Sequence, residues 1–175
     1  WQGGTLLGHV CEVLAAGLRG PVVVVRAAGQ RLPRLPAGVE VVEDPVADLG
    51  PGAALVTGLD AVAALPGSPE AAFVAATDLP LLSETSVQRL VAELVRMPQT
   101  DLVAVLVDGH PQWLAAAYRV AAREVLAAAV AAGERRVGAV VGACRSVIVT
   151  PQALGLDPEE FTNLNDPTAY EHAQD

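Results

Sequence analysis

The sequence contains no lysine, and it has only two cysteines, one methionine and few aromatic residues. Cys11 and Cys144 lie far apart and neither belongs to a CxxC pair, which excludes a structural zinc site and disfavours a disulfide framework. We therefore expect both thiols to pack as small apolar side chains in a reducing cytoplasm. An aromatic fraction of 3% beside a hydrophobic fraction of 52% indicates a core of Ala, Val and Leu, too aliphatic for a disordered chain.

Long apolar runs and a basic leader are also missing. No run reaches the roughly 18 residues that a membrane helix needs, and no basic segment followed by a cleavage site is visible at the start. We expect a soluble protein that is not exported. The net charge of -9 and the pI near 4.7 make nucleic acid and anionic membranes poor partners, because both would be repelled. A small anionic substrate stays open, since a local cluster of arginines can outweigh the overall sign.

Three common catalytic motifs are absent as well. The sequence has no GxSxG, HExxH or GxxxxGK(S/T) segment, which argues against hydrolase, zincin and P-loop functions. The histidines His9, His110 and His172 show no mutual spacing that suggests a metal. We expect His9 on a helix surface, His110 in a loop, and Trp113 and Tyr118 in sheet packing.

What the sequence does contain is a regular alternation of strand and helix patterns. Thr5 is a candidate N-cap for a helix in which Leu7, Val10, Leu14 and Leu18 recur at spacings of three and four. The alternation predicts one α/β domain with a mostly parallel sheet and helices on both faces. The predicted strands are 21–27, 38–44, 71–78, 101–109, 112–120 and 145–151. Besides the helix after Thr5, the predicted helices are 53–65, 84–97 after the cap Ser83, 121–134, and a last helix from Asp166.

Two carboxylates end predicted strands. Asp78 ends the strand in "AAFVAATDLP", just before Leu79 and Pro80, and Asp44 ends the strand before it, ahead of Pro45. Ligands of open α/β sheets bind beyond the carboxyl ends of the strands, and one or two carboxylates with phosphate oxygens suit Mg²⁺. We expect the two strands to be neighbours, so the pair of carboxylates predicts a magnesium–phosphate site. Strand position alone leaves open the alternative that Asp78 only caps a turn or the next helix.

Two loops offer groups for an anion. Gly50, Pro51 and Gly52 precede a predicted helix, so the backbone can approach a ligand closely and the free N–H groups can bind an anion or a base edge. Arg135 and Arg136 follow a predicted helix end and could neutralise a substrate phosphate. A plain Gly-Pro turn and two solvated arginines at a helix C-terminus are the alternatives.

A pair of asparagines stands near the end of the chain. Asn163 and Asn165 lie two residues apart, so in an extended stretch both amides face the same way. Paired amides suit the donor and acceptor edge of a heterocycle. Turn-forming asparagines before a helix are the alternative.

Taken in order, these segments resemble the molybdenum cofactor guanylyltransferase family. The resemblance spans nearly the whole chain from Thr5 onward and rests on "VVED", "LGPGAALVTGLDAV", "FVAATDLPLLSETSVQRL", "HPQWLAAAYRV", "GERRV" and "FTNLNDPTAYEHA". It implies a three-layer, Rossmann-like nucleotidyltransferase fold. It also implies transfer of GMP from GTP to molybdopterin with release of pyrophosphate, and it allows a molybdoenzyme or its chaperone as a further partner.

The resemblance also implies roles for single residues. Asp78 would bind the Mg²⁺ that bridges the nucleotide phosphates, and Asp44 would contact the base and ribose side. The base and ribose would also be contacted by Gly50, Pro51 and Gly52. The pterin phosphate would be contacted by Arg135 or Arg136, and the molybdopterin pocket would be lined by Asn163 and Asn165.

The chain departs from the family pattern at its start and in one loop. Family members begin with a strand and a glycine-rich loop that carries an arginine and a lysine, whereas this chain opens at "WQGGTLL". We therefore expect residues 1–175 to be one domain that lacks its natural N-terminal strand and phosphate loop. The loop "LGPGAAL" replaces a more usual Gly-Pro-Leu-Ala-Gly, which leaves a CTP-using molybdopterin cytidylyltransferase open. Another small-molecule nucleotidyltransferase, for sugar phosphates or isoprenoid precursors, and a degenerate nucleotide-binding module without turnover are the remaining alternatives.

Overall fold

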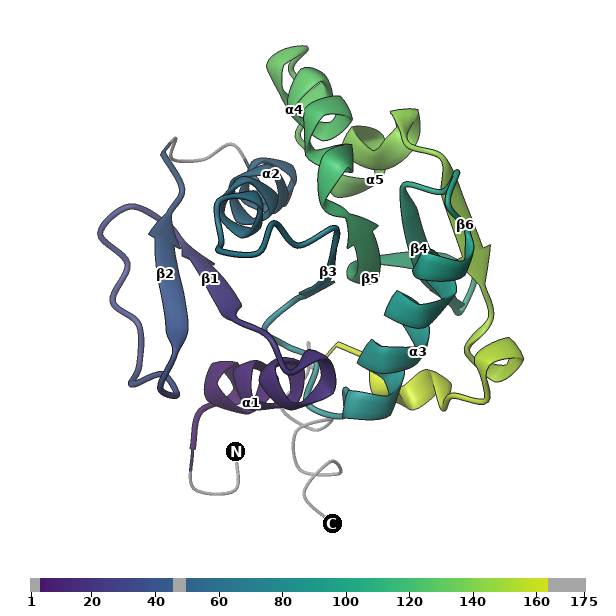
Figure 1. The fold of residues 1–175 in the computed structure, drawn as a ribbon, viewed down its shortest axis with the longest axis horizontal. Coiled ribbons are helices and arrows are strands. Elements are labelled where there is room, and N and C mark those ends of the chain that lie inside the picture. The colour runs from purple at the N-terminus through teal and green to yellow at the C-terminus, as the bar shows by residue number, and fades with distance from the viewer. Residues whose placement is uncertain (1–3, 46–49, 164–175) are drawn as a thin grey trace.

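Two small sheets lie between two layers of helices in the computed structural model, which describes residues 4–45 and 50–163 (Figure 1). The strands are β1 (Val22–Arg26), β2 (Val39–Glu43), β3 (Ala71–Ala75), β4 (Leu102–Val107), β5 (His110–Arg119) and β6 (Ser146–Val149). The α-helices are α1 (Leu6–Leu18), α2 (Pro51–Ala63), α3 (Glu84–Arg96), α4 (Arg123–Ala131) and α5 (Val137–Val140). Short 3₁₀ helices are η1 (Val120–Ala122), η2 (Val141–Ala143), η3 (Pro151–Leu154) and η4 (Pro158–Phe161).

Local sequence signals account for the starts of two helices. The Oγ1 atom of Thr5 accepts a hydrogen bond of 3.1 Å from the backbone N–H of Gly8 and caps α1. The Oγ atom of Ser83 accepts one of 3.1 Å from the N–H of Ser86 and caps α3. Both caps, and the strands and helices predicted before residue 151, are confirmed, with ends shifted by a few residues.

The strands form one parallel pair and one mixed sheet. β1 pairs in parallel with β2, while the second sheet has the order β3-β5-β4-β6. β6 is parallel to β4, but β5 runs antiparallel to both β3 and β4. The reversal occurs at Asp108 and Gly109, whose φ angles of 49° and 76° are those of a tight hairpin turn. The α/β class is confirmed, and the hairpin makes the larger sheet mixed.

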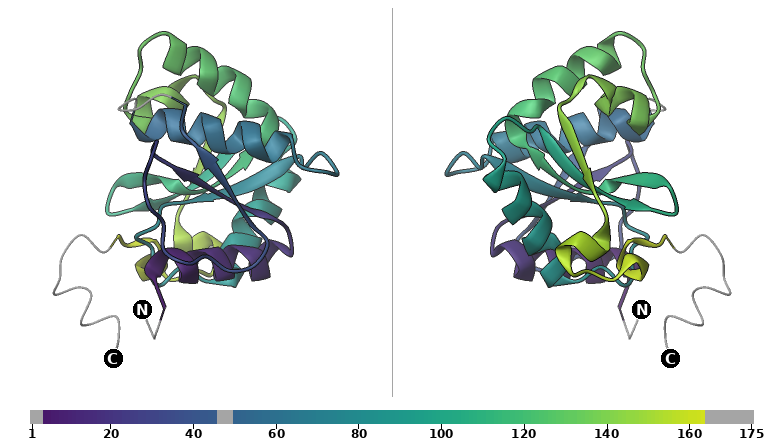
Figure 2. Two further views of the ribbon diagram at one scale, coloured as in Figure 1. Left: turned by 90° about the vertical axis from the view of Figure 1, so that its left-hand side faces the viewer. Right: turned by 90° about the vertical axis from the view of Figure 1, so that its right-hand side faces the viewer.

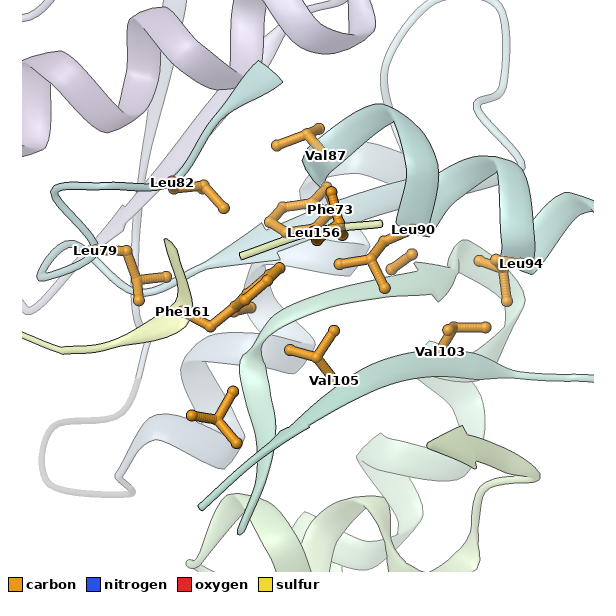
Figure 3. Packing of buried hydrophobic residues seen from close by; sticks show 13 residues of the cluster. Phe73, Leu79, Leu82, Val87, Leu90, Leu94, Val103, Val105, Leu156 and Phe161 are labelled. Atoms are coloured by element: carbon orange, nitrogen blue, oxygen red, sulfur yellow. The ribbon is translucent and has the colours of Figure 1, made fainter. Parts of the chain in front are cut away.

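Helices cover both faces of the strands. α2 and α4 lie on one face, and α1 and α3 lie on the other, as Figure 1 shows. Alternate residues of β4 enter different cores: Val103 and Val105 pack with α3 (Figure 3), whereas Leu102 packs with α2 and α4. Tyr118 of β5 is also fully buried, and its hydroxyl donates a 2.8 Å hydrogen bond to the carbonyl oxygen of Trp113. The sheet packing expected for both aromatic residues is therefore confirmed.

An apolar cavity of about 490 Å³ separates β1 from β3. Consecutive residues of both strands line it, and side chains of α1 and α2 line it from the two faces; Figure 2 shows these two helices on opposite sides of the strands. In the described part of the chain, β1 pairs only with β2, and β3 pairs only with β5. Each of the two strands bordering the cavity therefore has one edge without a strand partner.

The helix predicted from Asp166 lies outside the described residues. Among the helices that are described, none is long and apolar enough to cross a membrane.

Candidate functional site

Asp78 lies half-buried in the turn that joins β3 to α3. Leu79 and Leu82 of this turn are only 1% and 3% exposed, and they pack in the same core as Phe161 (Figure 3). Within the described residues, no hydrogen bond or ion pair engages the Asp78 carboxylate, and Ser83 is the residue that caps α3. The structure therefore does not use Asp78 as a cap, and its carboxylate is available to a ligand.

Asp44 is half-buried and follows β2, but β2 is not a neighbour of β3. The prediction that Asp44 and Asp78 end neighbouring strands is wrong, because the hairpin places β5 beside β3 and the cavity separates β3 from β1. Residues 4–45 and 50–163 contain no group of three or more His, Cys, Asp or Glu side chains that could hold a metal. A metal at Asp78 would therefore need oxygen ligands from the substrate and from water.

The start of α2 packs directly against residues 135–140. Gly50 has a φ of 78°, in the left-handed region that favours glycine, and Pro51 occupies the first turn of the helix. A Cβ atom added at Gly50 or Gly52 would lie 3.3 Å from the carbonyl oxygen of Arg135, and one at Gly52 would lie 2.7 Å from Cγ2 of Val140. The structure thus brings together the Gly-Pro-Gly loop and the arginine loop, which are about 80 residues apart in the printed sequence.

Arg135 and Arg136 are both exposed, and neither guanidinium forms an ion pair within the described residues. Among the described residues, no side chain caps the neighbouring N-terminus of α2. The backbone of Arg135 therefore lies beside the N-terminus of α2, so the segment that carries both arginines adjoins the positive end of a helix dipole, which favours anions.

The C-terminal segment is attached beside the start of α3. Glu160 of η4 accepts hydrogen bonds from the backbone N–H of Ser83 at 3.1 Å and from Oγ of Ser86 at 2.7 Å. Asn163, two residues after η4, is exposed. Asn163 therefore follows a segment that is bonded to the end of the Asp78 turn, whereas Asn165 lies outside the described residues.

Sequence reasoning missed two residues that contact this turn. His9, expected on a helix surface, is half-buried, and its Nε2 atom lies 3.1 Å from the carbonyl oxygen of Pro80. Glu160 is the second. No local pattern signals either one, because their partners lie 71 and 77 residues away in sequence.

Neither cysteine is suited to act as a nucleophile. Cys11 is buried and Cys144 is half-buried, and both are free thiols. Burial raises the pKa of each thiol above its ordinary value, so both stay protonated near neutral pH. The expectation that they pack as apolar residues is confirmed by their places in two apolar clusters.

Solved structures define the class of this fold. A nucleotidyl transferase from Methanothermobacter thermautotroptrophicus matches with a TM-score of 0.67 and 15% identity, covering 98% of this chain and 82% of that chain. Molybdopterin-guanine dinucleotide biosynthesis protein A from Archaeoglobus fulgidus matches with a TM-score of 0.63 and 21% identity, covering 77% of this chain and 66% of that chain. The fold is that of the Rossmann-like nucleotidyltransferases, as expected from the sequence.

Sequence similarity goes further than the fold. The chain belongs to the MobA-like NTP transferase domain family, whose model matches residues 1–147. A Mycobacterium tuberculosis relative named "Probable molybdenum cofactor guanylyltransferase" is 36% identical over 162 residues, which are 92% of this chain and 75% of the relative. The family resemblance seen in the sequence is thereby confirmed.

Proposed function

We propose that the protein is a molybdenum cofactor guanylyltransferase that transfers GMP from GTP to molybdopterin in the cytoplasm. The observation that carries the proposal is the 36% identity, over 92% of the chain, to a relative of that name. The free thiols of Cys11 and Cys144 support a reducing compartment. The product would pass to a molybdoenzyme or its chaperone.

In the proposed reaction, an oxygen of the terminal phosphate of molybdopterin attacks the α-phosphorus of GTP. A new P–O bond forms while the bond from the α-phosphorus to the oxygen bridging toward the β-phosphate breaks. Pyrophosphate leaves with the electron pair of that bond. No residue forms a covalent intermediate, because the protein contributes by positioning the two substrates and by neutralising phosphate charge.

Asp78 fits a Mg²⁺ site of the kind that phosphate-transferring enzymes use. Mg²⁺ is commonly held by one or two carboxylates together with substrate phosphates and waters. Asp78 offers one half-buried carboxylate that has no bonded partner among the described residues. Bound Mg²⁺ would supply charge neutralisation at the nucleotide phosphates, and the chain itself would hold the carboxylate in the turn between β3 and α3.

The other candidate residues are proposed to divide between the two substrates. The segment of Arg135 and Arg136 adjoins the start of α2, which no described side chain caps, and this supports a phosphate contact there because arginines and a helix N-terminus both favour negative charge. The proposed contacts are Asp44, Gly50, Pro51 and Gly52 with the base and ribose of GTP, Arg135 or Arg136 with the pterin phosphate, and Asn163 and Asn165 with the pterin.

We also propose that an extended strand fills the cavity between β1 and β3 and completes the domain. The support is the apolar cavity itself and the two strand edges that border it without partners in the described chain. α1 leads directly into β1 and lines the cavity, so a strand joined ahead of α1 would enter as a crossover parallel to β1. Intact-mass analysis of the protein from its natural host tests this: a mass above 17.9 kDa is expected, and an equal mass contradicts it.

The function is tested by measuring pyrophosphate release by the protein from its natural host, with Mg²⁺ and molybdopterin, comparing GTP with CTP. Release with GTP that depends on molybdopterin is the expected result. Release with CTP instead would make the protein a cytidylyltransferase, which the altered loop at Gly50 to Gly52 keeps as the second candidate. No release with either nucleotide, while nucleotide still binds, would identify a binding module without turnover.

A further inference from the structure

The turn that carries Asp78 is attached to two distant parts of the chain. On one side, Nε2 of His9 in α1 lies 3.1 Å from the carbonyl oxygen of Pro80, two residues after Asp78. A carbonyl oxygen can only accept, so Nε2 carries the hydrogen in this bond. His9 therefore ties α1 to the middle of the turn.

The second attachment is at the end of the same turn. Oε2 of Glu160 accepts hydrogen bonds from the backbone N–H of Ser83 at 3.1 Å and from Oγ of Ser86 at 2.7 Å. Ser86 is fully buried, so its hydroxyl needs a partner inside the protein. Leu79, just before the first attachment, and Leu82, just before the second, anchor the turn in the apolar core (Figure 3).

The Asp78 carboxylate itself is held by no bond within the described residues. Its position is therefore set by the backbone of the turn, and the turn is set by the groups that flank it. We propose that His9 and Glu160 are positioning residues that hold the Asp78 turn in the geometry needed for metal and phosphate binding. The proposal rests on the proposed function for its consequence in catalysis, but the attachment can be tested without the reaction.

The first test is hydrogen exchange at the backbone amides of residues 77–83 in the full chain. The variants are H9L, which removes the donor, and H9Q, whose amide can still donate to the Pro80 carbonyl. H110Q is the matched control, because Nδ1 of His110 also bonds a backbone carbonyl, that of Asp108 at 2.8 Å, but in the hairpin between β4 and β5. We expect exchange to rise about two- to tenfold in H9L, the factor that corresponds to one hydrogen bond, with recovery in H9Q and no change in H110Q.

Glu160 provides a second variant that does not depend on α1. E160A should speed exchange of the Ser83 amide by a similar factor, because that N–H loses its acceptor. E160Q keeps an acceptor oxygen and should restore slow exchange. Unchanged exchange in both H9L and E160A would overturn the proposal whatever the protein catalyses.

The second test is the Mg²⁺ concentration that gives half-maximal pyrophosphate release. We expect H9L to raise this Mg²⁺ concentration about two- to tenfold, and we expect H9Q to restore the wild-type value. In a D78N background, H9L should cause no further loss of pyrophosphate release, since both changes act through one carboxylate. Faster exchange with an unchanged Mg²⁺ requirement would make the two attachments purely structural and would overturn the positioning role. If the wild-type protein releases no pyrophosphate at all, the proposed function fails, and the exchange data still decide whether His9 and Glu160 hold the turn.

Discussion

Gly52 is the position at which the candidate nucleotide loop is packed most tightly, so G52A is the sharpest test of how the site is assembled. A Cβ atom there would lie 2.7 Å from Cγ2 of Val140. Carbon atoms in contact prefer about 3.5 Å or more, so one partner has to move by about 0.8 Å. Val140 is 0% exposed and packs in an apolar cluster, so its movement would disturb neighbouring side chains.

The expected magnitude is the difference between two effects. Overpacking a core typically costs about 1–3 kcal/mol, while replacing glycine by alanine in a helix returns about 0.5–1 kcal/mol. We expect a net loss of about 1–2 kcal/mol in the free energy of unfolding. For a chain of 175 residues this corresponds to a fall in Tm of about 2–8 °C.

Thermal unfolding of G52A beside G142A gives the comparison. Gly142 is the matched control because a Cβ added there meets no heavy atom within 4 Å, so its Tm should stay the same or rise slightly. Removing the clashing methyl groups with V140A should cost less in the G52A background than in the wild type. A G52A protein as stable as the wild type, or losses that simply add, would refute the close contact between α2 and α5.

Three further outcomes are expected. D78N should leave Tm unchanged, because the carboxylate has no bonded partner among the described residues. The same variant should lower pyrophosphate release by about 10²-fold or more, and unchanged turnover would refute the metal-binding role of Asp78. Hydrogen bonds from Arg145 hold the pKa of Asp101 below its ordinary value of 3.8, so this stabilisation is complete above pH 3.8 and is lost as the pH falls through the lower value of the folded state. D101N should therefore melt lower than the wild type at pH 7, and the two Tm values should converge in unfolding curves taken toward pH 2. Y118F loses the bond to the Trp113 carbonyl and should cost about 1 kcal/mol in chemical unfolding with no change in turnover; a drop in turnover would show that the buried hydroxyl also serves the site.

The sequence predicted those features that are encoded within a few residues. The caps Thr5 and Ser83 were recognisable because an N-cap acts on an N–H three residues ahead. Runs such as "PVVVVRA" predicted strands because β-branched side chains suit a pleated, buried backbone. Elements of this kind can be predicted without knowledge of the strand that pairs with them.

The order of the strands was harder to predict, because pairing depends on contacts between distant segments. The Asp108–Gly109 pair is a hairpin signal that would have shown β5 to be antiparallel to β4. It does not show that β2 would pair with β1, which the cavity separates from β3, and this arrangement is why Asp44 and Asp78 do not end neighbouring strands. The hydrogen bond between His9 and the Pro80 carbonyl cannot be predicted from sequence periodicity, since no helical or strand period extends over 71 residues.

The two parts of the candidate site are held in different ways, and this determines which substitutions can separate function from stability. The start of α2 is fixed by direct packing of glycine against Val140 and the Arg135 carbonyl, so any added atom at Gly52 disturbs the fold and the loop together. The Asp78 turn is fixed by its neighbours, while the carboxylate contributes no bond of its own within the described residues. A group that the fold does not use can be changed without cost to the fold. A loss of activity in D78N can therefore be assigned to the chemistry of that carboxylate, whereas a loss in G52A cannot be assigned without its measured stability.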